Sequence, residues 1–120
     1  MNYVFDVDGT LTPSRSAMYG PFKGWFLDWI KNKNVYLITG SDYAKTLEQI
    51  GPEVAHNVNV IYNCAGNSIY VRGQLVYKSD WRIGGDLELF LQDWLEYSGY
   101  PTRTGTHIEH RIGLCNFSVV

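Results

Sequence analysis

The chain has 120 residues, a formal net charge of −2 and a hydrophobic content of 45%. These values suit a globular chain that is long enough to bury a core, and they exclude a disordered polymer. The charge balance provides no positive surface for nucleic acid or acidic lipid, and no apolar run reaches the roughly 18 residues that span a bilayer. We therefore expect no nucleic-acid partner and no membrane association.

The cysteines and the first residues indicate the compartment. Cys64 and Cys115 have no metal-type spacing and are too few for a disulfide framework. They suit buried thiols in a reducing environment. Asp6 and Asp8 interrupt any apolar segment of a signal peptide. We therefore expect a cytoplasmic location.

The first predicted element is an apolar strand that ends in two carboxylates. Residues 3–5 are Tyr-Val-Phe, which suits a strand buried on both faces of a parallel sheet. If the strand continues, Asp6 and Asp8 point the same way, and Gly9 then allows a sharp turn. Two crowded carboxylates repel each other unless a cation such as Mg²⁺ lies between them. One carboxylate could then attack an electrophile while the other moves a proton.

This stretch has two other interpretations. In the first, Asp6 caps a turn and Asp8 is a solvated loop residue. In the second, an EF-hand calcium loop starts at Asp6. The EF-hand is excluded, because Leu11 stands at its glycine position and Ala17 at its closing glutamate position.

The next elements complete a β–α–β unit. Residues 12–20 contain proline, serine and glycine, which predicts a loop over the strand end with Arg15 near the carboxylates. Pro21 opens a predicted helix, because apolar residues then recur at helical spacing. Residues 35–38 predict a second buried strand, so the sheet is expected to be parallel.

The second predicted strand ends in Thr39-Gly40-Ser41-Asp42, directly before a short helix that Gly51-Pro52 is expected to stop. A hydroxyl and free N–H groups at the amino end of a helix form a phosphate site. The alternative is that Ser41 or Asp42 only caps the helix. The position at the end of the second parallel strand favours phosphate binding, with Ser41 as first candidate and Thr39 as second.

The sequence after residue 57 predicts elements with a structural role and contains two arginines that are candidate phosphate ligands. These elements are a third strand at 58–62, a hairpin of residues 68–71 and 74–77, a polar hinge at 79–85, a helix at 86–98 and two strands with a turn near 112–113. Arg103 and Arg111 could bind phosphate, because a guanidinium fork matches phosphate oxygens. The alternative is a pair of surface arginines that contact local carboxylates.

Taken together, these motifs resemble the haloacid-dehalogenase (HAD) phosphohydrolase superfamily and, within it, the eukaryotic-type phosphomannomutases. The resemblance runs along essentially the whole chain. It rests on D-V-D-G-T-L-T-P-S-R at 6–15, G-S-D at 40–42 with E-Q-I-G at 48–51, G-Q-L-V-Y at 73–77, and G-T-H-I-E-H-R-I-G-L-C-N-F-S at 105–118.

The resemblance implies a set of roles. Asp6 would form an aspartyl-phosphate, Asp8 would be the general acid/base, and both would hold a Mg²⁺ ion. Ser41 would bind the transferred phosphoryl group. Further contacts to the substrate would come from Arg15, Arg103 and Arg111.

The resemblance also implies the architecture. The fold class is α/β, with a partial HAD-like Rossmannoid parallel sheet in residues 1–81 and the beginning of an α+β cap in residues 82–120. Thr104 stands where the family has an arginine before its cap strand. The family's third motif, a lysine, and its fourth motif, an acidic loop, would follow Val120. The sequence therefore suggests a fragment of a longer product, or a homodimer that covers an open sheet edge.

The implied function is a magnesium-dependent phosphotransferase acting on hexose phosphates. It would convert mannose 6-phosphate to mannose 1-phosphate, which supplies GDP-mannose. One alternative is a sugar-phosphate phosphatase, in which water accepts the phosphoryl group. Another is a catalytically inert module that binds sugar phosphates.

Overall fold

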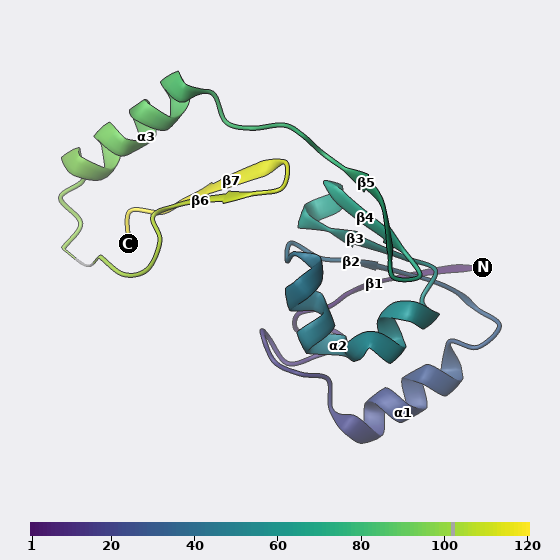
Figure 1. Ribbon diagram of the computed structural model, residues 1–120. Coiled ribbons are helices and arrows are strands. Elements are labelled where there is room, and N and C mark those ends of the chain that lie inside the picture. The colour runs from purple at the N-terminus through teal and green to yellow at the C-terminus, as the bar shows by residue number, and fades with distance from the viewer. Residues whose placement is uncertain (102) are drawn as a thin grey trace. The chain divides into compact units, whose positions relative to one another are not determined.

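The computed structural model describes residues 1–101 and 103–120 and divides into two compact units, Met1–Ser79 and Asp80–Val120 (Figure 1). The sequence predicted a division after residue 81. The first unit contains a five-stranded sheet and the second a two-stranded sheet. No helix in the described ranges has both the length and the apolar character needed to cross a bilayer.

The first unit is an α/β layer in which the strands follow the order β1-β2-β3-β4-β5. The strands are β1 (Asn2–Asp6), β2 (Asn34–Ile38), β3 (Val60–Asn63), β4 (Ser68–Val71) and β5 (Gln74–Lys78). The first three pair in parallel and the last two are antiparallel. Helix α1 (Gly20–Trp29) connects β1 to β2, and α2 (Tyr43–Asn57) connects β2 to β3. The prediction of an α/β fold with parallel strands is confirmed.

The core of this unit lies between the sheet and its two helices, which Figure 1 shows on the same side of the sheet. Val35, Leu37 and Ile61 point into this layer and are at most 1% exposed. Phe26 of α1 and Ile50 of α2 cover them from the helical side. Alternate strand residues therefore fix the three parallel strands against the helices.

The expectation that β1 is buried on both faces is wrong. Tyr3 and Phe5 pack against the core, and the Phe5 ring meets Phe26 edge-on with ring centroids 5.9 Å apart. Val4 points the other way and is 62% exposed. The reason is that, among the described residues of this unit, both helices lie on one side of the sheet and leave the other face of β1 uncovered.

Gly51 kinks α2, whereas the sequence predicted that Gly51-Pro52 would end the helix. Gly51 has φ 80° and ψ 159°, a conformation that is essentially restricted to glycine. Pro52 then opens a second helical segment that continues to Asn57. Proline suits this position because the first turn of a helix does not need its missing N–H.

The second unit consists of α3 (Gly85–Tyr97), β6 (Ile108–Arg111) and β7 (Leu114–Phe117). The two strands pair antiparallel, and the predicted turn at 112–113 lies between them. No residue of α3 is buried, and its Phe90 and Trp94 are each 54% exposed. His110 Nε2 lies 3.0 Å from Glu88 Oε1, which links β6 to α3. That this unit begins a cap domain stays a prediction.

Gly51→Ala is expected to lower the free energy of unfolding by about 1–3 kcal/mol, because alanine is strained in the backbone conformation of Gly51. Its Cβ would also collide with the Lys23 side chain, whose Nζ pairs with Glu53 at 3.0 Å. Urea denaturation followed by circular dichroism measures the change.

Gly24→Ala is the matched control. Gly24 lies inside α1 with open space where a Cβ would stand, so alanine should raise the free energy of unfolding by about 0.5–1 kcal/mol. Equal effects of the two substitutions would contradict the kink at Gly51.

Candidate functional site

The predicted site residues of the first unit meet at the carboxyl edge of the parallel strands. Asp6 is the last residue of β1 and pairs in register with Ile38, the last residue of β2. Thr39 follows directly, and its N–H donates to the Tyr62 carbonyl oxygen of β3 at 3.0 Å. Since parallel strands end at the same edge, the topology brings Asp6 and Thr39 together at the usual ligand-binding edge of an open α/β sheet.

A tight loop after β1 fixes the two aspartates. The Val7 carbonyl oxygen accepts hydrogen bonds from the N–H groups three, four and five residues later, at 3.0–3.2 Å. Val7 and Leu11 are buried and anchor the loop in the core, and Gly9 makes the turn with φ 73°. Asp6 is exposed and Asp8 is partly exposed, so both remain accessible.

Two donors hold Asp8 through one carboxylate oxygen. Gln49 Nε2 donates to Asp8 Oδ1, and the Arg15 N–H donates to the same oxygen at 3.0 Å. The Gln49 hydrogen bond, followed by that of Arg15, holds the pKa of Asp8 below its ordinary value, with a smaller effect from the Lys45 charge and a partial offset by burial. Asp8 is therefore ionised at neutral pH.

The loop after β2 separates the capping residue from the candidate phosphate ligand. Asp42 Oδ1 accepts the Lys45 N–H at 2.8 Å and caps α2. The Ser41 N–H donates to Thr39 Oγ1 at 3.1 Å. The sequence left open whether Ser41 or Asp42 caps the helix, and the structure assigns the cap to Asp42. The Ser41 hydroxyl is therefore not the helix cap and stays a candidate phosphate ligand.

Asn63, at the end of β3, supports this loop and was missed by the sequence analysis. Its buried Nδ2 donates to the Ser41 carbonyl oxygen at 3.1 Å and to Thr46 Oγ1 at 2.9 Å. The Thr46 hydroxyl in turn donates to the Asp42 carbonyl oxygen at 2.8 Å. The signal that could have found it is an amide at the core-facing end of a predicted strand.

Gln49 is the second residue that the sequence analysis missed. It lies on the buried face of α2, is 4% exposed and contacts Asp8. Its backbone oxygen also accepts the Met18 N–H at 2.7 Å, which ties the loop after β1 to α2. The signal was a pair of polar residues, Thr46 and Gln49, spaced three apart on a helix that packs against a core.

The three candidate arginines lie in different settings. Arg15 belongs to the loop after β1, has φ 54° and contributes its backbone N–H to Asp8. Arg103 belongs to the second unit, where its guanidinium donates to the carbonyl oxygens of Leu95 and Ser98 at 2.8 and 2.9 Å and also contacts that of Val119. Arg111 Nε pairs with a Glu109 carboxylate oxygen at 2.9 Å. A phosphate would have to replace these contacts of Arg103 and Arg111.

Asp6 and Asp8 are the residues of this edge that could hold a cation. In residues 1–101 and 103–120, no three His, Cys, Asp or Glu side chains gather in a group suited to a metal ion. Mg²⁺ nevertheless commonly keeps several waters beside one or two carboxylates. Asp8 Oδ1 already accepts two hydrogen bonds, so Asp8 would contribute its backbone oxygen to the ion and leave Oδ2 open. These hard oxygen donors fit Mg²⁺ with a shell completed by water.

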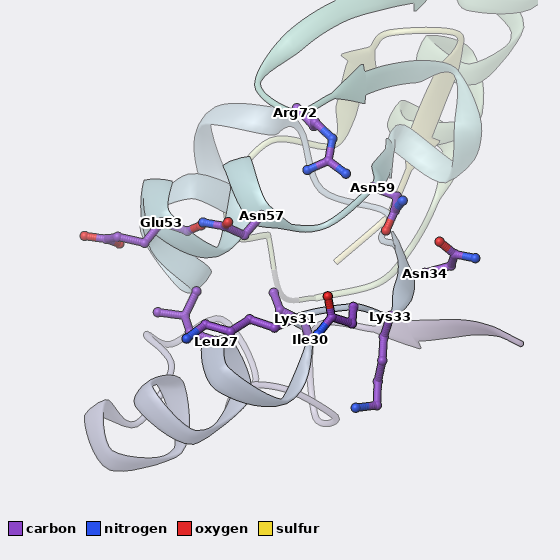
Figure 2. Close-up of a pocket in the computed structure, with 10 residues that line it drawn as sticks. Leu27, Ile30, Lys31, Lys33, Asn34, Glu53, Asn57, Asn59 and Arg72 are labelled. Carbon is purple, nitrogen blue, oxygen red and sulfur yellow. The ribbon is translucent and has the colours of Figure 1, made fainter.

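A separate hollow of about 630 Å³ lies at the opposite end of β2 from Thr39 (Figure 2). Its lining residues are Leu27, Ile30, Lys31, Asn32, Lys33, Asn34, Glu53, Asn57, Asn59 and Arg72. Two of its three cations have partners within the unit, since Lys31 pairs with Asp28 and Lys33 donates to the Trp29 carbonyl oxygen. None of the predicted site residues lines this hollow.

Comparison with known proteins finds relatives along almost the whole chain. No family model matches it. Phosphomannomutase 1 of Mus musculus and that of Homo sapiens are each 32% identical to this chain over an alignment of 126 residues. The alignment covers 98% of this chain and 48% of each relative. The phosphomannomutase of Saccharomyces cerevisiae is 34% identical over 125 residues, with the same two coverages. The chain spans about half the length of the curated relatives it matches.

Solved structures share the fold. A haloacid dehalogenase-like hydrolase from B. subtilis gives a TM-score of 0.55 at 18% identity and covers 78% of this chain and 32% of that one. A phosphatase of the same superfamily from Bacteroides thetaiotaomicron gives 0.54 at 18% identity, with coverages of 81% and 36%. At this identity the likeness concerns the fold alone. The predicted HAD-like fold, present in part, is confirmed.

Asn63→Ala is expected to lower the free energy of unfolding by about 1–3 kcal/mol, because it removes two buried hydrogen bonds and leaves polar partners behind. The midpoint of urea denaturation measures the change. Asn67→Ala is the matched control: it removes one partly buried hydrogen bond to the Cys64 carbonyl oxygen, so it should cost about 0.5–1 kcal/mol. A control effect as large as that of Asn63→Ala would contradict the role given to the Asn63 side chain.

Proposed function

We propose that this chain, a homologue of the phosphomannomutases within the HAD superfamily, carries an aspartate-based phosphoryl-transfer site for hexose phosphates. The observation that carries the proposal is the meeting of two aspartates with a hydroxyl-bearing loop at the carboxyl edge of β1 and β2. The similarity to phosphomannomutases over 98% of the chain supports the choice of substrate class.

In the first half-reaction, a carboxylate oxygen of Asp6 attacks the phosphorus of the hexose phosphate. The bond between phosphorus and the sugar oxygen breaks, and that oxygen takes a proton from Asp8, which has first gained it from water. In the second half-reaction, another sugar hydroxyl attacks the phosphorus of the aspartyl-phosphate and loses its proton to Asp8. The acyl–phosphate bond breaks, which restores the Asp6 carboxylate.

The other residues of the edge would bind and orient the phosphoryl group. The Ser41 hydroxyl lies at the amino end of α2, where free N–H groups and the helix dipole favour an anion. A bound Mg²⁺, with Asp6 and Asp8 as its protein ligands, would neutralise charge on the phosphoryl oxygens. Arg15 would contact the substrate from the same unit. We also propose that Arg103 and Arg111 contact the substrate.

The conversion of mannose 6-phosphate to mannose 1-phosphate is the finer form of this proposal, because the relatives are named phosphomannomutases. Hydrolysis is the second candidate, because the solved structures with this fold include a hydrolase and a phosphatase. In hydrolysis, water takes the place of the second sugar hydroxyl. A cytoplasmic location, a homodimer and the absence of nucleic-acid or membrane partners stay predictions.

Asp6→Asn is expected to reduce turnover of mannose 6-phosphate by the 120-residue chain with Mg²⁺ to background, because the amide cannot form the aspartyl-phosphate. Mannose 1-phosphate and orthophosphate are both measured. Isomer formation selects the mutase, and orthophosphate release without isomer selects the phosphatase. Asp28→Asn, which changes an exposed carboxylate of α1, is the control and should keep full activity.

Undiminished turnover by Asp6→Asn would reject Asp6 as the nucleophile. Thermal stabilisation of the unaltered chain by mannose 6-phosphate and Mg²⁺, with neither product formed, would identify an inert binding module instead.

A further inference from the structure

We propose that Gln49 is a positioning residue that fixes the orientation of the Asp8 carboxylate, so that the oxygen turned away from Gln49 exchanges the proton with the substrate. The proposal rests on the phosphoryl-transfer function proposed above, since it concerns the general acid/base of that reaction. It assigns a role to a buried side chain of α2 that lies in the E-Q-I-G stretch at 48–51, for which the resemblance implied no role.

The hydrogen-bond pattern at Asp8 separates its two carboxylate oxygens. Gln49 Nε2 and the Arg15 N–H both donate to Oδ1. Two donors use the two lone pairs of that oxygen. Both of these hydrogen bonds end on Oδ1, so Oδ2 is the oxygen left to give and take a proton.

The Gln49 donor is itself held in place. The residue is 4% exposed on a helix that packs against the core, between the fully buried Thr46 and Ile50. Its backbone oxygen accepts the Met18 N–H at 2.7 Å. A donor on a packed helix fixes its partner more narrowly than one on a mobile loop.

The negative charge of the Asp8 carboxylate determines the orientation of the Gln49 amide. An ionised carboxylate only accepts hydrogen bonds, so the amide must turn its NH₂ group toward Asp8. The other amide atom, Oε1, is then buried and has no hydrogen-bond donor among the described residues. A buried acceptor without a partner carries a desolvation penalty.

Asn63 Oδ1 is also buried without a partner, so what distinguishes Gln49 is that its donor ends on the candidate acid/base and not on the scaffold. An apolar side chain of the same length would fill the space of Gln49 without the penalty at Oε1. Asp8 is partly exposed, so water can replace the lost donor at its Oδ1. A residue that serves the fold alone would not need an amide here, whereas one that orients Asp8 does.

Gln49→Met keeps the length and the apolar bulk of the side chain and removes the donor. Steady-state kinetics of the full chain with mannose 6-phosphate and Mg²⁺ should show kcat lowered about ten- to a hundred-fold with KM within about two-fold of the unaltered value, because a misplaced acid/base affects the chemical step. The melting temperature Tm should stay the same or rise. A purely structural Gln49 would show the reverse: a lowered Tm with kcat kept.

Ile50→Val is the matched control on the adjacent buried position. It removes one methyl group from the core and should lower Tm slightly while leaving kcat and KM unchanged. If Ile50→Val lowers kcat as much as Gln49→Met does, the effect is one of packing and the proposal is wrong.

A measurement without turnover keeps the two proposals apart. Three-bond NMR couplings from the Asp8 side-chain carboxyl carbon to its backbone nitrogen and carbonyl carbon report whether χ1 occupies one rotamer. The unaltered chain should show one rotamer, and Gln49→Met should show averaging. One rotamer in both proteins overturns the role of Gln49, even if turnover is absent. Averaging only in the variant, together with absent turnover, supports the role of Gln49 and rejects the function.

Discussion

Two polar side chains on the buried face of α2 hold the candidate site together. The Thr46 hydroxyl accepts a hydrogen bond from the Asn63 amide and donates one to the Asp42 carbonyl oxygen. It therefore connects β3 to the loop after β2. Gln49, three residues later, binds Asp8 through its side chain and Met18 through its backbone. The loops that follow β1 and β2 and the end of β3 thus depend on one helix. Ile50 and Val54 pack α2 against the sheet. The positions of these loops and of the end of β3 therefore depend on the core.

This arrangement suits phosphoryl transfer, in which the protein contributes mainly positioning and electrostatic stabilisation. The loop after β1 is closed on the Val7 carbonyl oxygen, and the loop after β2 is braced by the Asn63 amide. Asp6 remains exposed at the strand end, where a substrate could reach it. The site therefore combines fixed backbone with accessible carboxylates. Val4 of β1 is exposed, because the elements of the first unit cover only one face of the sheet at this edge.

Much of this edge could be predicted from the sequence, because strand periodicity and turn residues are local signals. The end of an apolar strand located Asp6, and the sequence Thr-Gly-Ser-Asp before a helix located Ser41. Burial was harder to predict. The apolar run of β1 looked like a doubly covered strand, but the helices of the first unit cover only one face of the sheet. Gly51-Pro52 looked like a stop, but proline is also a good first residue of a helix, and α2 continues.

The partners of Gln49 and Asn63 could not be predicted, because the contacts join residues 41 and 22 positions apart along the chain. The local pattern can mark each as a polar residue on a packed face, but it does not identify the group that it contacts. Arg103 illustrates the converse. Its charge indicated phosphate, while the structure shows it on carbonyl oxygens at the carboxyl end of α3, where a cation also interacts well with the helix dipole.

Native-state hydrogen exchange of the ligand-free chain tests most directly whether α2 holds this edge as one fixed site. The informative amides are those of Met18, Cys64 and Ala65, which donate to the carbonyl oxygens of Gln49, Ser41 and Thr39. The account predicts that they open with free energies close to that of Leu37 in the centre of β2, because loops and core open together. Exchange of these three amides at the rate of free loops, with Leu37 still protected, would contradict it.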